Sequence, residues 1–260
     1  MPRAFTRVVS PRLPECALTH LERTAIDYPK AAAQHAAYEQ ALIDAGFEII
    51  RLPDLPDDPD AVFVEDTALL LGRHVIITRP GIASRADETE STAAGLEASF
   101  EVHRLGSGFL DGGDVLRIGR KLYVGLSTRT DAEGIDSLRQ TAAPLDFEVV
   151  QAELRDCLHL KSGATFAGPD VHGTPVLLYS ERAVDPRQFA AIDPLPVDET
   201  EPAAANCLRA GARLILPAGN PRTAGLLRDR GFKVTEVDVS ELQKAEAGVT
   251  CMSLIDEGPP

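Results

Sequence analysis

Short apolar runs separated by turn residues recur along the chain and predict strands that pair as hairpins. Each pair flanks a short segment that contains glycine, which adopts the positive φ of tight turns at no steric cost. The predicted hairpins are 61–71 with 74–78 around Gly72-Arg73, 115–118 with 121–126 around Gly119-Arg120, a pair that flanks 168–174, and 207–216 around Ala210-Gly211. Further strands are predicted at 5–9, 47–52 and 249–255.

Between these strands, apolar residues recur at the spacing of amphipathic helices. The predicted helices are 28–45, which ends at Gly46, 88–99, 132–143, 187–192 and 221–230. Residues 52–60 contain three prolines and four aspartates and are predicted to form a loop. The alternation of paired strands with helices indicates an α/β fold.

The order of these elements repeats along the chain. Successive units open at Glu65, Asp111, His159, Asn206 and Cys251, at spacings of 46, 48, 47 and 45 residues. Each unit has the order strand, turn, strand, helix, strand (ββαβ), and about five such units fit the chain better as a closed ring than as an open solenoid. We therefore expect residues 1–260 to form a single domain, closed by the strands near its two ends. Equivalent strand starts in such a ring converge on the axis.

Composition indicates a soluble globular protein and excludes some classes of binding partner. Lys and Arg total 26 against 40 Asp and Glu, and the formal net charge of −14 argues against nucleic acid or an anionic membrane as a partner. The apolar runs are far shorter than the ~20 residues of a membrane span, and residues 1–9 lack the apolar core of a secretory signal. Four widely spaced cysteines form no zinc-binding pattern. We expect a cytoplasmic protein with free thiols.

Three of the positions that the repeat aligns carry groups suited to covalent catalysis. Cys251, His159 and Asp111 would supply a nucleophile, an acid/base and a carboxylate that orients the imidazole. Gly248, close to the cysteine, would let a ligand approach the backbone. Each residue also has a simpler explanation: a buried structural thiol, a hydrogen-bonded core histidine, and a β-turn at Asp111-Gly-Gly-Asp114.

Other charged residues favour a zwitterionic ligand with a cationic tail. Glu65 and Asp66 interrupt an apolar run, where buried carboxylates need a cation from a ligand or from a structural arginine. Arg85 and Arg129 follow hairpins at equivalent places in two repeats. They are either surface residues or a pair that binds a carboxylate through forked hydrogen bonds. Acids at the centre and arginines at the rim suit an arginine-like small molecule.

Six ordered motifs resemble those of the dimethylarginine dimethylaminohydrolases, over about residues 5 to 255. The motifs are Asp60-x-x-Phe-Val-Glu-Asp, Ile77-Thr-Arg-Pro-Gly, Leu110-Asp-Gly-Gly-Asp-Val, Leu158-His-Leu-Lys-Ser, Ala205-Asn-Cys and Thr250-Cys-Met-Ser-Leu. The resemblance implies a single catalytic domain with the five-bladed αβ propeller, or pentein fold, shared with arginine deiminases and amidinotransferases. This implication agrees with the repeat.

The resemblance also implies an activity, the hydrolysis of Nω,Nω-dimethyl-L-arginine and of the monomethyl compound to citrulline. Cys251 would attack the guanidinium carbon to form a covalent thiouronium intermediate, with His159 as the acid/base and Asp111 as its partner. Because the thiol lies among carboxylates, we expect the bound guanidinium to promote thiolate formation.

The remaining roles implied by the resemblance concern binding. Glu65 and Asp66 would hold the guanidinium, Arg85 and Arg129 the α-carboxylate, and Asp60 with the backbone of Leu18 and Ala245 the amino-acid end. Leu18 lies in a segment that resembles the family's lid. No metal or organic cofactor is required, although zinc bound by Cys251 and His159 would inhibit. A homodimer is compatible with the family, whose members differ in assembly.

Three other functions remain as alternatives to this interpretation. Arginine and agmatine deiminases carry His-x-Asp where this chain has His159-Leu-Lys161, and the absent carboxylate leaves room for N-methyl groups. A citrulline-hydrolysing enzyme would share the fold, and so would a non-catalytic arginine-binding propeller, which does not need Cys251 and His159 together.

The sequence departs from the family pattern at Glu246-Ala247, at the small Ala245, and at Asp131, which would add negative charge near the carboxylate clamp.

Overall fold

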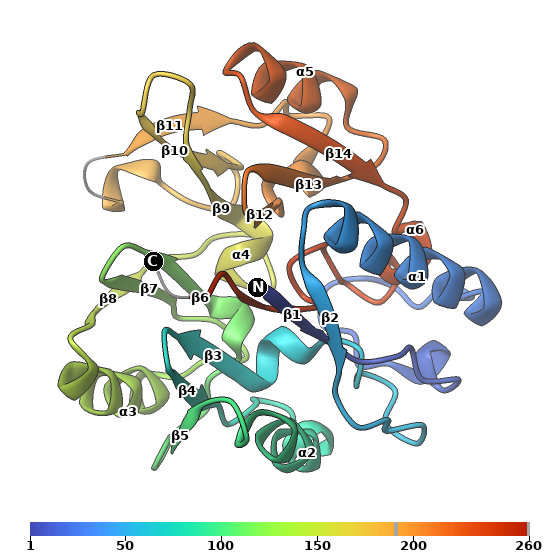
Figure 1. Ribbon diagram of the computed structural model, residues 1–260, viewed down its shortest axis with the longest axis vertical. Helices are drawn as coiled ribbons and strands as arrows, with labels where there is room; N and C mark the ends of the chain where they lie inside the picture. The colour runs from blue at the N-terminus through green and yellow to red at the C-terminus, as the bar shows by residue number, and fades with distance from the viewer. Residues whose placement is uncertain (190–191, 259–260) are drawn as a thin grey trace.

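The computed structural model describes residues 1–189 and 192–258, whose strands form five three-stranded sheets around a common centre (Figure 1). In the order first, second and third strand, the sheets are β15 (Leu254–Asp256), β1 (Arg3–Thr6) and β2 (Glu48–Arg51); β3 (Ala68–Leu71), β4 (His74–Ile77) and β5 (Glu101–Arg104); β6 (Val115–Ile118), β7 (Lys121–Gly125) and β8 (Glu148–Ala152); β9 (Ala164–Pro169), β10 (Pro175–Tyr179) and β11 (Asp193–Pro196); and β12 (Leu208–Ala210), β13 (Arg213–Pro217) and β14 (Lys233–Val237).

Helices lie on the outside of the ring, in the connections from second to third strands (Figure 1). These are α1 (Tyr28–Asp44), α2 (Ala86–Leu96), α3 (Ala132–Ala142) and α5 (Pro221–Asp229). Of two one-turn helices, α4 (Leu160–Gly163) lies near the centre and α6 (Ser240–Gln243) lies beside α1. Short 3-10 turns are η1 (Leu13–Glu15), η2 (Val64–Thr67), η3 (Ala83–Arg85), η4 (Gly112–Asp114), η5 (Ala143–Leu145), η6 (Pro186–Gln188) and η7 (Pro202–Ala205).

Each sheet has the same topology, which confirms the predicted α/β ring of five units; four have the order ββαβ, whereas the described residues between β10 and β11 contain only the turn η6. The first and second strands pair antiparallel, and the second and third pair in parallel. A parallel pair needs a crossover connection, which the outer helices supply in the other four units. The ring closes in one sheet, where β1 pairs with β15 and Arg3 lies opposite Asp256.

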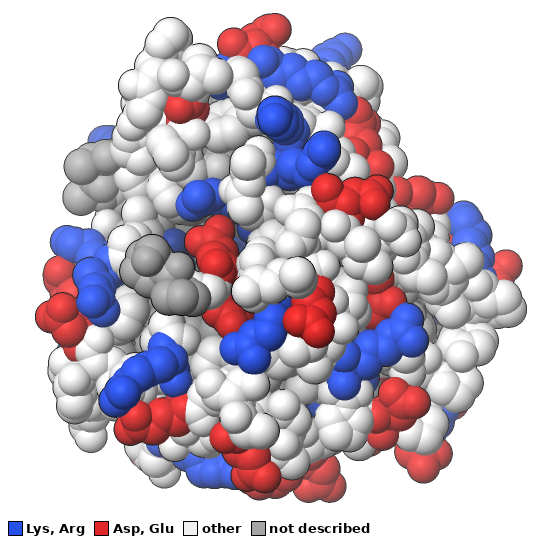
Figure 2. Space-filling view, viewed as in Figure 1, with Lys and Arg blue, Asp and Glu red and all other residues white. Residues whose placement is uncertain are grey.

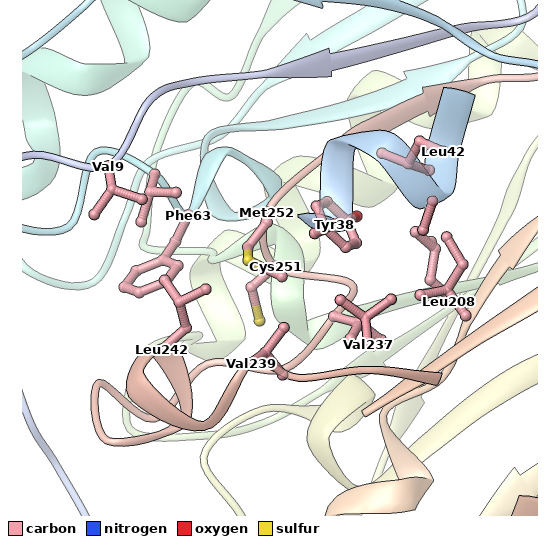
Figure 3. Packing of buried hydrophobic residues seen from close by; sticks show 14 of the residues in the cluster. Val9, Tyr38, Leu42, Phe63, Leu208, Val237, Val239, Leu242, Cys251 and Met252 are labelled. Atoms are coloured by element: carbon pink, nitrogen blue, oxygen red, sulfur yellow. The ribbon is translucent and has the colours of Figure 1, made fainter. Parts of the chain in front are cut away.

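The first strands of the five sheets line a central cavity of about 850 Å³. Away from it, apolar side chains pack in clusters between neighbouring elements. One cluster joins α1 and the segments around η1 and α6, and it includes Tyr38, Leu42 and Cys251 (Figure 3). The predicted nucleophile is therefore packed against the hydrophobic core.

Several predicted elements differ from the structure, and backbone and side-chain polar bonds explain most differences. The strand predicted at 5–9 ends at Thr6 because Arg7 turns inward and donates to the carbonyls of Pro53 and Ala61 (3.0 and 3.0 Å). In the run 61–71 only β3 is a strand, since η2 precedes it. The strand predicted at 249–255 is confined to β15 by the turn that holds Cys251.

The helix predicted at 187–192 is wrong over its described residues, where the chain forms the single turn η6; residues 190 and 191 lie outside the described part. Proline opens η6, and the Asp185 carboxylate accepts from the N–H of Arg187 (3.0 Å), which satisfies the turn locally. Of the third strands, β2 was predicted at 47–52, whereas β5, β8 and β14 were predicted only as members of the repeat. Each of these three begins with an exposed charged residue and contains further polar residues, so no apolar run marks its position.

Among the residues that the structure describes, no helix combines the length and apolar character needed to cross a bilayer. Lysine and arginine side chains are interspersed with aspartate and glutamate on the face in Figure 2, despite the net charge of −14. This face presents no continuous basic surface.

Candidate active site

Cys251 lies in a turn between α6 and β15, and Asn206 fixes that turn. The Asn206 Oδ1 accepts from the N–H of Thr250 (3.0 Å), and its Nδ2 donates to the Thr250 hydroxyl (3.0 Å). A Cβ at Gly248 would lie 2.2 Å from Cγ of Asn206, so glycine makes room for this side chain rather than for a ligand. The thiol accepts from the N–H of Gly248 (3.3 Å) and lies near Phe63 in the apolar cluster (Figure 3).

His159 directly precedes α4 and is held by carboxylates of the turn around η4. Its Nε2 lies 3.2 Å from Oδ2 of Asp111. Asp114 accepts from the N–H of Leu160 (3.0 Å), which fixes the backbone beside the histidine. A Cβ at Gly113 would lie 2.6 Å from Nδ1 of His159, so a glycine is needed for the ring to pack here. The Asp111-Gly-Gly-Asp114 segment is thus both a turn and a support for the imidazole.

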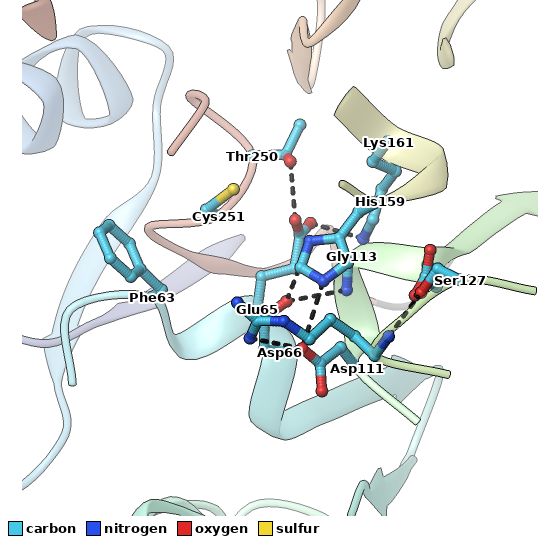
Figure 4. Close-up of polar contacts among 12 residues, drawn as sticks. Phe63, Glu65, Asp66, Asp111, Gly113, Ser127, His159, Lys161, Thr250 and Cys251 are labelled. Atoms are coloured by element: carbon cyan, nitrogen blue, oxygen red, sulfur yellow. Dashed lines mark hydrogen bonds and ion pairs between the residues drawn. The ribbon is translucent and has the colours of Figure 1, made fainter. Parts of the chain in front are cut away.

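Glu65 and Asp66 are buried in η2, and each forms an ion pair with a protein cation (Figure 4). Glu65 pairs with Lys161 (2.6 Å) and also accepts from the Thr250 hydroxyl (2.7 Å). Asp66 pairs with Arg85 (2.6 Å). The alternative in which a structural arginine supplies the cation is therefore confirmed for Asp66, and a lysine supplies it for Glu65.

A small pocket contains the thiol and the imidazole together. It is lined by Ala17, Asp60, Phe63, Asp66, Arg85, Arg129, Leu158, His159, Ala245, Glu246, Ala247 and Cys251. Three predicted site residues are not among them. Asp111 lies against His159, Glu65 lines the central cavity, and Leu18 packs against the apolar cluster that includes Ala245. The structure thus brings seven of the ten predicted residues to one pocket.

Both predicted arginines are buried, so the interpretation as surface or rim residues is wrong. Arg85 donates to Glu88 through Nε and Nη2 (3.1 and 2.9 Å), to Asp66, and to the carbonyl of Phe63 (2.9 Å). These bonds use the whole guanidinium fork. Arg129 donates to the Thr19 hydroxyl (2.8 Å), and its Nη1 lies 3.7 Å from Asp111.

Asp131 is committed to the start of α3 rather than to the carboxylate clamp. Its carboxylate accepts from the N–H of Gly134 (2.7 Å) and from that of Phe109 (3.1 Å). The first bond is an N-cap, and the positive end of the helix dipole stabilises the negative charge there. The departure from the family pattern at this position is therefore explained by helix capping.

Residues 16–23, called the lid below, are tied to the pocket by two carboxylates. Asp60 accepts from the N–H of Ala17 (3.2 Å). Glu246 accepts from the N–H groups of Thr19, His20 and Leu21 (2.9, 2.5 and 2.6 Å), and it has a positive φ of 61°. Such a φ is unfavourable for glutamate, so the surrounding bonds must hold it. Glu246, which lines the pocket, therefore ties the lid backbone to it.

The buried charges around the site shift the pKa values of its two reactive groups, the Cys251 thiol and the His159 imidazole. Burial, with the nearby Glu65 and Asp66, raises the pKa of the Cys251 thiol to about 12. Burial alone would lower the pKa of His159, but Asp66, Asp114 and Asp111 raise it to about 9. At neutral pH the site therefore holds a thiol and an imidazolium.

The groups that could hold a metal here are already engaged by the protein. Ligand atoms of Asp66, Asp111 and His159 lie within 4.8 Å of one another. Asp66, however, pairs with Arg85 and accepts from the N–H of Gly113 (3.1 Å). Inhibitory zinc at Cys251 and His159 stays a prediction.

Comparison with known proteins assigns the chain to a protein family. The family model described as "N,N dimethylarginine dimethylhydrolase, eukaryotic" matches residues 19–167. A dimethylarginine dimethylaminohydrolase of Streptomyces coelicolor is 41% identical, over 97% of this chain and 96% of that protein. The chain belongs to the dimethylarginine dimethylaminohydrolase family. Another member, from Pseudomonas aeruginosa, is 39% identical over 88% of this chain and 89% of its own length.

Solved structures agree with this dimethylarginine dimethylaminohydrolase assignment. A cysteine-to-serine variant of the Pseudomonas aeruginosa enzyme in complex with citrulline superposes with a TM-score of 0.91 at 35% identity, over 98% of this chain and 99% of that chain. The N-terminal domain of the cyanobacterial arginine dihydrolase ArgZ shares the fold, with a TM-score of 0.81 at 24% identity over 100% of this chain and 99% of that chain. These matches confirm the pentein fold.

Sequence reasoning gave no supporting role to several residues of this dimethylarginine dimethylaminohydrolase site. They are Glu88, Asp114, Lys161, Asn206 and Glu246. Asn206 is in phase with Cys251 in the repeat, so its position was the available signal. Glu246 was noted only as a departure from the family pattern, and nothing in the sequence indicates that its partner is the lid backbone.

Proposed function

We propose that this protein hydrolyses Nω,Nω-dimethyl-L-arginine, and the monomethyl compound, to L-citrulline and the corresponding methylamine. The observation that carries the proposal is one buried pocket, lined by Cys251, His159 and Asp66, in a member of this family. The cysteine is the nucleophile and the histidine is the acid/base. Asp66 has a pKa lowered by His159 and Arg85, although burial alone would raise it, and so keeps a negative charge for the guanidinium.

The substrate itself makes the thiol reactive. A thiol with a pKa of about 12 is almost fully protonated at neutral pH. A guanidinium held beside it stabilises the thiolate by charge attraction, and the proton leaves to solvent. The Cys251 Sγ then forms a bond to the guanidinium carbon.

His159 is charged correctly for the next step. As an imidazolium it donates its proton to the dimethylamine nitrogen, and the bond from that nitrogen to the central carbon breaks. A cationic thiouronium remains on Cys251, and the imidazole is now neutral. Asp111 keeps the ring oriented through the 3.2 Å contact at Nε2.

Neutral His159 then takes a proton from water, whose oxygen attacks the thiouronium carbon. The C–S bond breaks, and the hydroxyl proton of the tetrahedral carbon passes to the departing thiolate, which forms citrulline and restores the Cys251 thiol. The dimethylamine takes up the proton that the thiol released to solvent in the first step. Closure of the lid by Glu246 excludes bulk water during the first step and so protects the intermediate.

The amino-acid end of the substrate lies toward the lid in this proposal. Arg129 lines the pocket with fewer protein partners than Arg85, so it is the better placed of the two to bind the α-carboxylate. Arg85 contributes by fixing Asp66. Asp60 and the backbone of Leu18 and Ala245 complete the binding of the α-amino group.

We include in the proposal that residues 1–260 act as one catalytic domain in the cytoplasm. Closure of the ring by β1 and β15 supports the first point. Cys16, Cys157, Cys207 and Cys251 are all unpaired, which suits a reducing compartment.

Product analysis tests the function. We expect citrulline and dimethylamine from dimethylarginine, citrulline and methylamine from the monomethyl compound, and slower turnover of arginine. Cys251→Ser should abolish both products, whereas Cys157→Ser, a partly buried thiol outside the pocket, should retain activity. Faster turnover of arginine than of dimethylarginine would instead indicate a deiminase. Citrulline consumption would indicate a ureido hydrolase, and binding without turnover an arginine-binding protein.

A further inference from the structure

Two histidines and a glutamate converge on the sheet β3–β4–β5, away from the pocket. His74 opens β4, and Glu101 lies directly opposite it in the parallel pair with β5. His103 follows Glu101 by two residues, so its side chain lies on the same face of the sheet. The backbone register therefore brings the three side chains together, without a loop.

The distances among their ligand atoms match those around a tetrahedral metal ion. Nδ1 of His74 lies 3.1 Å from Nε2 of His103. The Glu101 oxygens lie 3.5 Å from the first of these nitrogens and 3.8 Å from the second. Ligands at the usual Zn–N and Zn–O lengths of about 2.0–2.2 Å are separated by about 3.3–3.6 Å in a tetrahedron. Shifts of a few tenths of an ångström would complete three edges of such a site.

The surroundings suit a metal ion that keeps one exchangeable position. The side chains of His74 and His103 are 18% and 25% exposed, and that of Glu101 is 54% exposed. The two imidazoles are held in place by the sheet, while the carboxylate faces solvent. Two imidazoles and one carboxylate form a donor set typical of zinc with water as the fourth ligand.

We propose that His74, Glu101 and His103 bind a divalent transition-metal ion of the Zn²⁺ class, separately from the active site. Zn²⁺ takes Nδ1 of His74, Nε2 of His103 and one Glu101 oxygen, and the imidazoles lose any proton at those nitrogens. β3 leads away from η2 and β4 leads back, so His74 lies at the end of β4 remote from Asp66. The ion therefore fastens β4 to β5 and stabilises the sheet without taking part in the chemistry.

Arg73 is the competing cation in this region. It donates to Oε2 of Glu101 (3.2 Å) and to Nε2 of His74 (3.4 Å). A His74 ring that binds a metal through Nδ1 carries its hydrogen on Nε2 and cannot accept this second bond. Arg73 is 80% exposed and must swing away when the metal binds. Removal of this arginine should therefore tighten metal binding.

Titration with Co²⁺, a spectroscopic substitute for Zn²⁺, tests the proposal in full-length Cys251→Ser protein. This background removes the thiolate that could bind metal at the active site. We expect one Co²⁺ per chain, with the visible bands of tetrahedral coordination by nitrogen and oxygen. His74→Gln and His103→Gln should each weaken binding at least tenfold, and Arg73→Ala should strengthen it. His172→Gln, at an exposed histidine in the turn between β9 and β10, is the matched control and should change nothing.

Thermal unfolding gives a second readout. Zn²⁺ should raise the Tm of the Cys251→Ser protein and leave that of its His103→Gln derivative unchanged, because a ligand stabilises only the form that binds it. In the active chain, His103→Gln should keep kcat on dimethylarginine, which shows that it folds. Absence of Co²⁺ binding, or binding that survives both histidine substitutions, would overturn the proposal. Neither result bears on the proposed hydrolase activity, which needs no metal.

Discussion

The charge on His159 is set by three carboxylates that the sequence places in two different units. Asp66 comes from η2, whereas Asp111 and Asp114 flank the glycines of η4. Their combined effect overcomes burial and gives a histidine that stays protonated at neutral pH. Such a residue is suited to start the reaction as an acid rather than as a base.

The pH dependence of kcat/KM follows from this charge. A group that must be protonated and has a pKa of about 9 gives activity that falls as the pH rises through 9. In Asp111→Asn one raising interaction is lost, so the fall should move to lower pH and kcat should drop by about 10²-fold. Steady-state kinetics from pH 6 to 10 would check both effects. An unchanged limb in Asp111→Asn would show that another group controls it.

Glu246 offers a test of the lid. Glu246→Ala removes the acceptor of three backbone N–H groups, so KM for dimethylarginine should rise by about tenfold and trypsin should cleave more rapidly after Arg23. Glu22→Ala, which removes an exposed carboxylate of the same lid, should alter neither property. Equal cleavage rates in wild type and Glu246→Ala would mean that other contacts hold the lid.

At the scale of elements, substitution of Asp131 should change the stability of the fold without changing catalysis. Asp131→Ala should lower the free energy of unfolding by about 1–2 kcal/mol, because α3 loses its N-cap and the N–H of Phe109 loses its acceptor. The value of kcat should stay unchanged. Asp136→Ala on the same helix, where the carboxylate pairs with Arg139 at the surface, should cost less than about 0.5 kcal/mol. Urea unfolding followed by circular dichroism would measure both.

What the sequence could predict at this scale depended on local signals. The glycines between β3 and β4 and between β6 and β7 adopt positive φ, so the turns of those hairpins were located correctly. The motifs predicted Cys251, His159 and Asp66, which line one pocket in the structure. The partners of those residues were not predictable, because Lys161 meets Glu65 and Asn206 meets Thr250 only after non-adjacent units pack together. The burial of Arg85 was not predicted for the same reason, since it depends on the ion pair with Glu88 one turn later.

At the scale of the whole molecule, net charge should influence substrate capture. The chain carries a formal charge of −14, and methylated arginine is a net cation at neutral pH. We expect kcat/KM to fall by roughly two- to fivefold as NaCl rises from low concentration to about 0.5 M, while kcat stays constant. Kinetics at several salt concentrations would test this. A kcat/KM that is insensitive to salt would show that only local charges guide binding.

The sheet that joins β15 to β1 also sets the order in which the enzyme is completed during synthesis. Arg3 is made 253 residues before its partner Asp256, and Cys251 comes only five residues before that partner. A nascent chain can build the middle units from local hairpins while its first strands still lack their neighbour. The thiol of Cys251 is therefore made after the histidine and the carboxylates of the site, and catalytic competence should arise only once residues 251–256 have left the ribosome.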